Sequence, residues 1–329
     1  MAPTGPSQWG NRTAGRPAET DQEETAGGRF GRRSFLRRSA VAAVSCGTLV
    51  GASGTAAAGG LTDGEGEKAA APSDYQRVST RDHFDSDGNL INGETAYSYD
   101  VEGSLPDSWG EETLTLLIHG FKSSDEDDDD IDSGYECQLA LEANGYTGDT
   151  AVFTWDADKG DSLDLGWADG KTIAEKNGRK LANFTQWYTN TYGVDIRWIA
   201  HSLGARVVLF ALQSLTEDYD QANAVESVSL LGAAVEEDDV STDAGWFDSE
   251  YGQYIEYAAE QCDNFYDDGD EVLEWIYETR EFEDAAGEKG CDGPEPANYT
   301  DHDVGDIVPT HYDYYIRDVG CIPQVVEKW

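Results

Sequence analysis

Basic residues are scarce in this chain of 329 residues. The 22 lysines and arginines stand against 66 aspartates and glutamates, which gives a net charge of −44. Such a surface repels the phosphates of nucleic acid, so nucleic acid is excluded as a partner. A disordered acidic chain would lack aromatic residues, which here make up 11% of the sequence. The composition therefore predicts a folded, halophilic protein that is kept soluble in strong brine.

The net charge predicts that the stability of the protein depends on the salt concentration. The distance over which salt screens charges grows from about 3 Å at 1 M to about 30 Å at 0.01 M, so repulsions that are silent in brine become long-ranged on dilution. We therefore expect the melting temperature to fall as salt is removed. A melting temperature that stays constant down to millimolar salt would contradict this reading.

Apolar runs long enough to span a membrane are not expected in the mature chain. The mildly apolar stretch 40–50 is too short and too rich in small residues. It follows Gly31-Arg32-Arg33-Ser34-Phe35-Leu36-Arg37, which is typical of a twin-arginine export signal, and we expect cleavage near Ala58 and secretion. Lipid anchoring at Cys46 is a weaker alternative, because an alanine occupies position −3 of its lipobox. The predicted organisation is a leader over 1–58, a loose mature N-terminus over 59–94 and one folded domain over 95–329.

Cysteines are few, and four remain once the leader is removed. An even number in an exported protein predicts two disulfides. The helix expected over 271–280 should run back along the strand that Cys262 begins, which favours a Cys262–Cys291 bridge. Cys137 and Cys321 are then left to form the second bridge. The sequence allows three pairings, and the other two stay open.

Strands and helices alternate along the chain. We expect strands over 95–101, 112–118, 150–154, 194–199, 225–235 and 263–266, and helices over 134–143, 167–192, 205–215, 251–261 and 271–280. This alternation predicts an α/β fold with a doubly wound, mostly parallel sheet.

A tight turn lies at the centre of this pattern. Ala200-His201-Ser202-Leu203-Gly204 joins the apolar strand 194–199 to a helix, in the A-x-S-x-G form of a nucleophile elbow. Small residues flank the serine because side chains there would collide in so sharp a turn. The turn therefore predicts Ser202 as a nucleophile, with the N-cap of a buried helix as the alternative role.

A serine hydroxyl needs a base, and the chain has only five histidines. His201 adjoins the serine but must diverge from it at the turn, His119 closes a buried strand, and His83 precedes the sheet. His302 and His311 remain, both downstream of the serine, where a base is expected. We favour His311, which lies at the edge of an aromatic run, over His302 in its acidic loop.

The acid is harder to choose among 66 candidates. A triad carboxylate belongs in the turn after a late strand, and Asp270 follows a glycine turn there and precedes a helix. Asp267, Asp268 and the cluster 236–239 are the competitors, and a helix N-cap is the other role open to Asp270.

Two backbone N–H groups are candidates for binding the developing oxyanion. Leu203 begins the helix after the serine, so its N–H has no partner within that helix. Phe121 follows His119-Gly120 after a buried strand, and Gly120 permits close approach of a substrate to the backbone.

Together these motifs resemble the α/β-hydrolase superfamily over roughly 95–319, most closely its exported, salt-adapted archaeal members. Ala200 stands where that family usually has glycine, a variant that its lipases and esterases also show. The resemblance implies that Ser202 is the nucleophile, His311 the base and Asp270 the acid, with the N–H groups of Phe121 and Leu203 as the oxyanion hole. It also implies that the domain over 95–329 is catalytic.

The expected function is a secreted serine esterase or lipase that acts on a small-molecule ester or lipid through an acyl-enzyme. The alternatives are an amidase, thioesterase or peptidase on the same fold, or a non-catalytic binding protein. No cofactor or metal is expected, and we expect a monomer. The acidic run 125–130 lacks the spacing of a calcium loop and is interpreted as a solvated face.

Overall fold

A computed structural model describes residues 68–106, 108–124, 128–159, 163–243, 251–281 and 283–329. The twin-arginine motif, Cys46 and the expected cleavage site lie outside these residues, as do Asp125–Asp127 of the acidic run.

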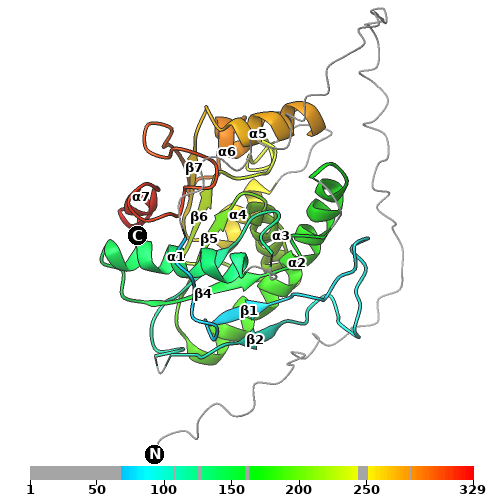
Figure 1. Ribbon diagram of the computed structural model, residues 1–329, viewed down its shortest axis with the longest axis vertical. Helices are drawn as coiled ribbons and strands as arrows, with labels where there is room; N and C mark the ends of the chain where they lie inside the picture. Colours follow the sequence, from blue (N-terminus) through cyan, green and yellow to red (C-terminus); the bar gives the residue numbers. More distant parts are fainter. Residues whose placement is uncertain (1–67, 107, 125–127, 160–162, 244–250, 282) are drawn as a thin grey trace, which may run out of the picture.

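The described chain is built on one eight-stranded sheet with the order β2-β1-β4-β3-β5-β6-β7-β8 (Figure 1). Only β1 and β2 pair antiparallel, and all other neighbours are parallel. The strands are β1 (Arg77–Ser79), β2 (Asp100–Glu102), β3 (Leu114–Ile118), β4 (Asp149–Thr154), β5 (Ile196–His201), β6 (Ser227–Leu231), β7 (Cys262–Tyr266) and β8 (Tyr299–Asp303). The predicted α/β class with a doubly wound, mostly parallel sheet is confirmed.

The helices connect these strands. They are α1 (Asp129–Ala143), α2 (Leu163–Tyr192), α3 (Gly204–Glu217), α4 (Gly252–Ala258), α5 (Glu271–Ile276), α6 (Ala286–Lys289) and α7 (Ile322–Val326), with a π-helical turn η2 (Tyr277–Glu281) after α5. In the part of the chain just defined, no helix is both long and apolar enough to cross a membrane.

The central strands bury both faces, because successive side chains point to opposite sides of the sheet. On β5, Trp198 joins the apolar cluster that also contains α2 and α3 side chains, whereas Ile199 joins the cluster that contains α1 and α7 side chains. α2 packs against α3 and α1 packs against α7 (Figure 1). The sheet is therefore enclosed between two helical layers, and the carboxyl ends of its strands carry the loops discussed below.

The N-terminal part differs from the expected loose segment over 59–94. Within its described residues, 68–94, β1 pairs with β4, and Tyr75, Val78 and Phe84 are buried. The strand expected over 95–101 is shorter, because Thr95 and Ser98 form a local turn instead. The Ser98 N–H donates to Thr95 Oγ1 (3.1 Å) and the Thr95 N–H donates to Ser98 Oγ (2.9 Å). Such side-chain bonds compete with the ladder of a sheet.

The predicted disulfides are wrong. Cys137, Cys262, Cys291 and Cys321 are free thiols. Cys137 and Cys321 lie in the apolar layer around α1 and α7, where buried thiols pack as small apolar side chains. The Cys291 N–H donates to Asp301, which pairs with Asn264, two positions along β7 from Cys262. Cys262 is buried in the apolar cluster around α2 and α3, and Cys291 packs against that cluster as a half-buried thiol.

Candidate functional site

The turn between β5 and α3 has the backbone that the elbow motif predicts. Ser202 has a φ of 52°, in the left-handed region that a residue with a side chain rarely adopts. A Cβ on Gly204 would lie 2.3 Å from the carbonyl oxygen of Ile118, so only glycine fits there. The Ser202 N–H donates to Leu231 O (3.0 Å) on β6, which holds the turn against the sheet. The packing of Gly204 against Ile118 and the bond of Ser202 to Leu231 therefore hold the strained serine in place.

The structure brings Ser202, His311 and Asp270 together in one hydrogen-bonded chain. The imidazole Nε2 of His311 lies 2.9 Å from Ser202 Oγ, and its Nδ1 lies 2.7 Å from Asp270 Oδ2. All three side chains are buried. Ser202 follows β5, Asp270 follows β7 and His311 follows β8, so three loops at the carboxyl edge of the sheet supply them. With a proton on Nδ1, the ring donates to the carboxylate and accepts from the serine hydroxyl.

Asp270 has two roles at this point. Its Oδ1 accepts from the N–H groups of Val272 and Leu273 (both 3.1 Å), so it is also the N-cap of α5. Burial opposes ionisation of this carboxyl, but the charge of His311 and the hydrogen bonds from His311 and Leu273 outweigh it. The pKa of Asp270 is therefore held below its ordinary value, and the group is a carboxylate at neutral pH.

His201 ties the serine turn to the loop of His311. Its Nε2 lies 2.7 Å from the backbone oxygen of His311, a contact in which the ring must donate. Burial, together with the charge of neighbouring His311, lowers the pKa of His201 to about 3. The ring is therefore neutral at ordinary pH, with its proton on Nε2. The expectation that His201 diverges from Ser202 agrees with this contact, but the link to His311 was not foreseen.

His119 orders the loop that carries Phe121. The backbone N–H of Trp155 donates to His119 Nε2 (3.2 Å), so the proton of the neutral ring is on Nδ1. His119 Nδ1 in turn donates to Gly120 O (3.1 Å). Burial, then the nearby charge of Arg81, lowers the pKa of His119 well below its ordinary value, so this ring is also neutral. In a trans peptide the C=O and the following N–H point in opposite directions. The bond to Gly120 O therefore turns the Phe121 N–H away from His119.

Gly120 places this loop directly against the serine. A Cβ on Gly120 would lie 2.9 Å from Ser202 Cβ, so the absence of a side chain allows the close approach. Leu203, the other candidate donor, is the N-cap residue of α3, before the first hydrogen bond of the helix. Both N–H groups thus belong to segments that flank Ser202.

The competing site residues lie elsewhere. His302 is on β8 and its Nε2 lies 2.7 Å from Asp263 Oδ1 on β7. Asp267 accepts from the Gly269 N–H (2.9 Å), and Asp268 is exposed. Asp239 lies 3.7 Å from Arg206 Nη2, and its pKa is raised to about 7, by burial above all.

Two groups of carboxylates have the chemistry to hold a cation. Ligand atoms of Glu236, Asp238 and Asp239 lie within 4.8 Å of one another. In the described part of the acidic run 125–130, Asp129 pairs with Lys68 (2.6 Å) and Asp130 with Arg81 (2.9 Å). Asp129 and Asp130 therefore already form ion pairs with basic side chains.

One family model matches residues 151–326, more than half of the chain, and its description reads "Protein of unknown function (DUF726)". The chain belongs to this family. The matched region contains Ser202, Asp270 and His311, whereas the loop of His119 and Phe121 precedes it. No curated protein matches the sequence.

Several solved structures resemble this DUF726 member in fold. Lipase BlEst2 of Bacillus licheniformis is 14% identical with a TM-score of 0.41, over 68% of this chain and 94% of that one. Aspergillus fumigatus lipase B is 12% identical with a TM-score of 0.40, over 64% of this chain and 52% of that one, so the chain spans about half of that lipase. An esterase of Pyrobaculum calidifontis is 12% identical with a TM-score of 0.33, over 66% and 75%. At such identities the likeness concerns the fold alone.

Proposed function

We propose that this protein is a serine hydrolase that cleaves carboxylic esters through an acyl-enzyme. The observation that carries the proposal is the chain Ser202 Oγ–His311 Nε2–His311 Nδ1–Asp270 Oδ2, with bonds of 2.9 and 2.7 Å, on a serine held at positive φ. A buried serine within reach of an imidazole that a carboxylate orients is the arrangement that acyl transfer requires.

The proposed reaction has two halves. Ser202 Oγ attacks the ester carbonyl while its proton passes to His311 Nε2, and the oxyanion that forms is bound by the N–H groups of Phe121 and Leu203. The ester bond then breaks, and His311 returns the proton to the leaving alcohol. A water molecule, deprotonated by His311, attacks the acyl-serine, and collapse of the second intermediate releases the acid and restores Ser202.

Ester cleavage is favoured over the alternatives because its leaving group needs the least assistance from the site. An alcohol leaves more readily than an amine, so the pieces described above suffice. The test is hydrolysis of p-nitrophenyl butyrate and of the matching p-nitroanilide in molar salt. We expect ester turnover and little anilide turnover. Faster anilide cleavage would indicate an amidase or peptidase, and no turnover of either would favour a binding protein.

His201 is part of the proposal as a positioning residue. Its bond to His311 O joins the nucleophile turn to the loop of the base, in addition to the bond between Ser202 and His311 themselves. A buried hydrogen bond contributes on the order of 1 to 3 kcal/mol when its loss leaves a partner unsatisfied, and about 1.4 kcal/mol corresponds to tenfold in rate. We therefore expect His201→Ala to lower kcat for p-nitrophenyl butyrate by about tenfold to a hundredfold with little change in KM.

His201→Gln is the matched control, because its amide N–H can still donate to His311 O. It should recover most of kcat. Replacing His201 also predicts a difference in acid stability from the wild type. The pKa of His201 is about 3 in the folded state, below its unfolded value near 6.5. As pH falls, His201 is therefore protonated in the unfolded protein before it is protonated in the folded protein. Its contribution to the free energy of unfolding is lost as pH falls from 6.5 towards 3. His201→Gln should lack that part of the acid sensitivity. Equal kcat in both variants would rule out the positioning role.

Export and adaptation to salt complete the proposal. The twin-arginine motif at Arg32-Arg33 and the net charge of −44 support a protein that is secreted into brine. N-terminal sequencing of protein recovered from the medium should find a start near Gly59. A chain recovered only from cells, with residues 1–58 still attached, would refute export.

A further inference from the structure

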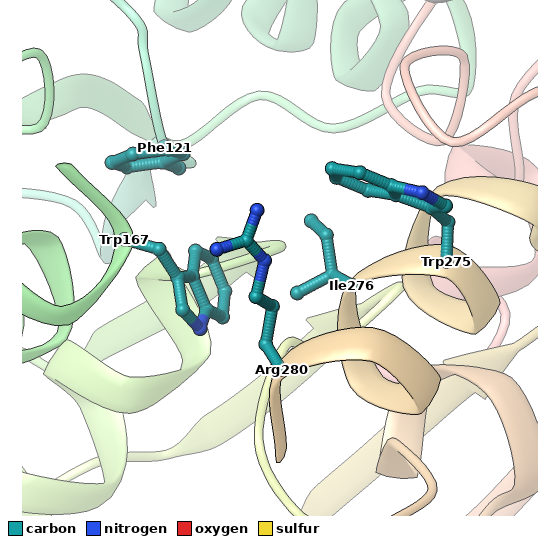
Figure 2. A pocket seen from close by; sticks show the side chains of 5 residues that line it. All are labelled: Phe121, Trp167, Trp275, Ile276 and Arg280. Carbon is teal, nitrogen blue, oxygen red and sulfur yellow. The ribbon is translucent and has the colours of Figure 1, made fainter. Parts of the chain in front are cut away.

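A shallow pocket lies beside the loop of Phe121, which follows Gly120. It has about 200 Å³ of free space, part of it open to solvent, and is lined by Phe121, Trp167, Trp275, Ile276 and Arg280 (Figure 2). Its walls come from three segments: the loop after β3, the first turns of α2, and α5 with η2. α5 is also the helix that Asp270 caps, so one short helix contributes to both the triad and the pocket.

The pocket adjoins one candidate oxyanion donor, Phe121, and the other, Leu203, lies near the same part of α2. Phe121 supplies one of these N–H groups from its backbone and one pocket wall from its ring, which packs edge-on against Trp167 at 5.5 Å. A Cβ on Gly170 of α2 would lie 2.7 Å from the Phe121 ring and 3.5 Å from Leu203 Cδ2. The side chains of the two donor residues therefore lie close to the same point on α2. A carbonyl whose oxygen is bound by both donors would have its carbon substituent next to this pocket.

The lining is apolar except at one place. Aromatic and aliphatic side chains form the walls, and Trp275 is 42% exposed. Figure 2 shows the Arg280 side chain between Trp167 and Ile276, with its guanidinium end reaching towards Phe121. The guanidinium also lies 5.7 Å from the centre of the Trp275 ring. An alkyl chain that extends past this group would strip water from a charge, which is unfavourable.

From this geometry we propose that the pocket binds the acyl group of the ester, and that Arg280 limits its length. The inference rests on the proposed function and names its substrate class: esters of short, compact carboxylic acids. The 200 Å³ includes space that is open to solvent, so the enclosed part is much smaller, and the Arg280 side chain forms one of its walls. Short acyl chains of a few carbons are therefore expected to fit, whereas long fatty acyl chains are not.

The test is a series of p-nitrophenyl esters from acetate to palmitate, in which the leaving group is constant and only the acyl chain varies. For the wild type we expect kcat/KM to peak at or below about six carbons and to fall at least tenfold by twelve. Arg280→Met keeps an unbranched side chain about as long as the aliphatic part of arginine and removes the charged guanidinium, so it should move the peak towards longer chains. Arg179→Met is the matched control, because Arg179 is an exposed arginine on α2 outside the pocket, and it should leave the profile unchanged.

The outcomes separate this inference from the proposed function. Activity that depends on Ser202 but peaks at twelve carbons or more would overturn the pocket assignment and leave the hydrolase proposal standing. A profile that stays the same in Arg280→Met and in Trp275→Ala would also overturn it. Trp275→Ala provides the second readout in case Arg280→Met folds poorly, since Trp275 is 42% exposed. Absence of any hydrolysis that depends on Ser202 would overturn both proposals.

Discussion

Ser202→Ala should lower kcat for p-nitrophenyl butyrate by about 10⁴- to 10⁶-fold, the range found when the nucleophile of a serine hydrolase is removed. The loss is large because the variant has no oxygen to form the acyl-enzyme, and His311 then has no proton to accept. KM should change little, because the apolar pocket and the backbone donors remain. Steady-state kinetics in molar salt measure both quantities.

The matched control is Ser214→Ala, which removes another buried serine, one that lies on α3. Ser214 Oγ donates to Asp218 Oδ2 (2.7 Å), one helical turn along, and takes no part in the triad. Its loss should affect stability slightly and activity hardly at all. Ser202→Ala protein with wild-type activity and an intact fold would remove Ser202 from the mechanism.

Asp270→Asn should lower kcat by roughly 10⁴-fold while the protein stays folded. The amide oxygen can take the place of Oδ1 and accept from Val272 and Leu273, so the cap of α5 survives. The amide nitrogen then replaces Oδ2 and donates to His311 Nδ1, which leaves the proton on Nε2. A protonated Nε2 cannot accept the proton of Ser202, so the base is lost although every side chain keeps its place.

Asp267→Asn is the control for this change. It alters a neighbouring carboxylate, three residues earlier, that accepts from the Gly269 N–H and makes no bond to His311 among those described. Its kcat should stay within a few-fold of wild type. Similar losses in both variants would mean that net charge near the site, and not the orientation of His311, controls the rate.

The sequence predicts which side chains the structure brings together, because three separate patterns point to Ser202, His311 and Asp270. The small residues around Ser202 predict a turn that the backbone does adopt, with φ at 52°. Elimination among five histidines left His311 ahead of His302, which the structure places beside Asp263. Asp270 followed from its position after a late strand, and the same position makes it the cap of α5.

Other features depend on contacts that no local pattern encodes. β8 reads Tyr-Thr-Asp-His-Asp and was missed, because its polar side chains are satisfied by β7: Asn264 donates to Asp301 Oδ1 (2.8 Å). The disulfide pairing failed because it assumed a path for the chain between β7 and β8. The bond from His201 to His311 O joins residues 110 positions apart, and the acyl pocket depends on how α5 and η2 lie against α2.

The most direct test of the central claim is covalent capture of the nucleophile. Diethyl p-nitrophenyl phosphate phosphorylates an activated serine: the serine oxygen bonds to phosphorus, its proton passes to the base, and p-nitrophenolate leaves. With folded protein in molar salt, we predict release of one p-nitrophenolate per chain, a diethylphosphoryl group on the peptide that contains Ser202, and much slower labelling of Asp270→Asn. Labelling of another residue, or labelling of Ser202 that is equally fast in Asp270→Asn or in unfolded protein, would contradict the account.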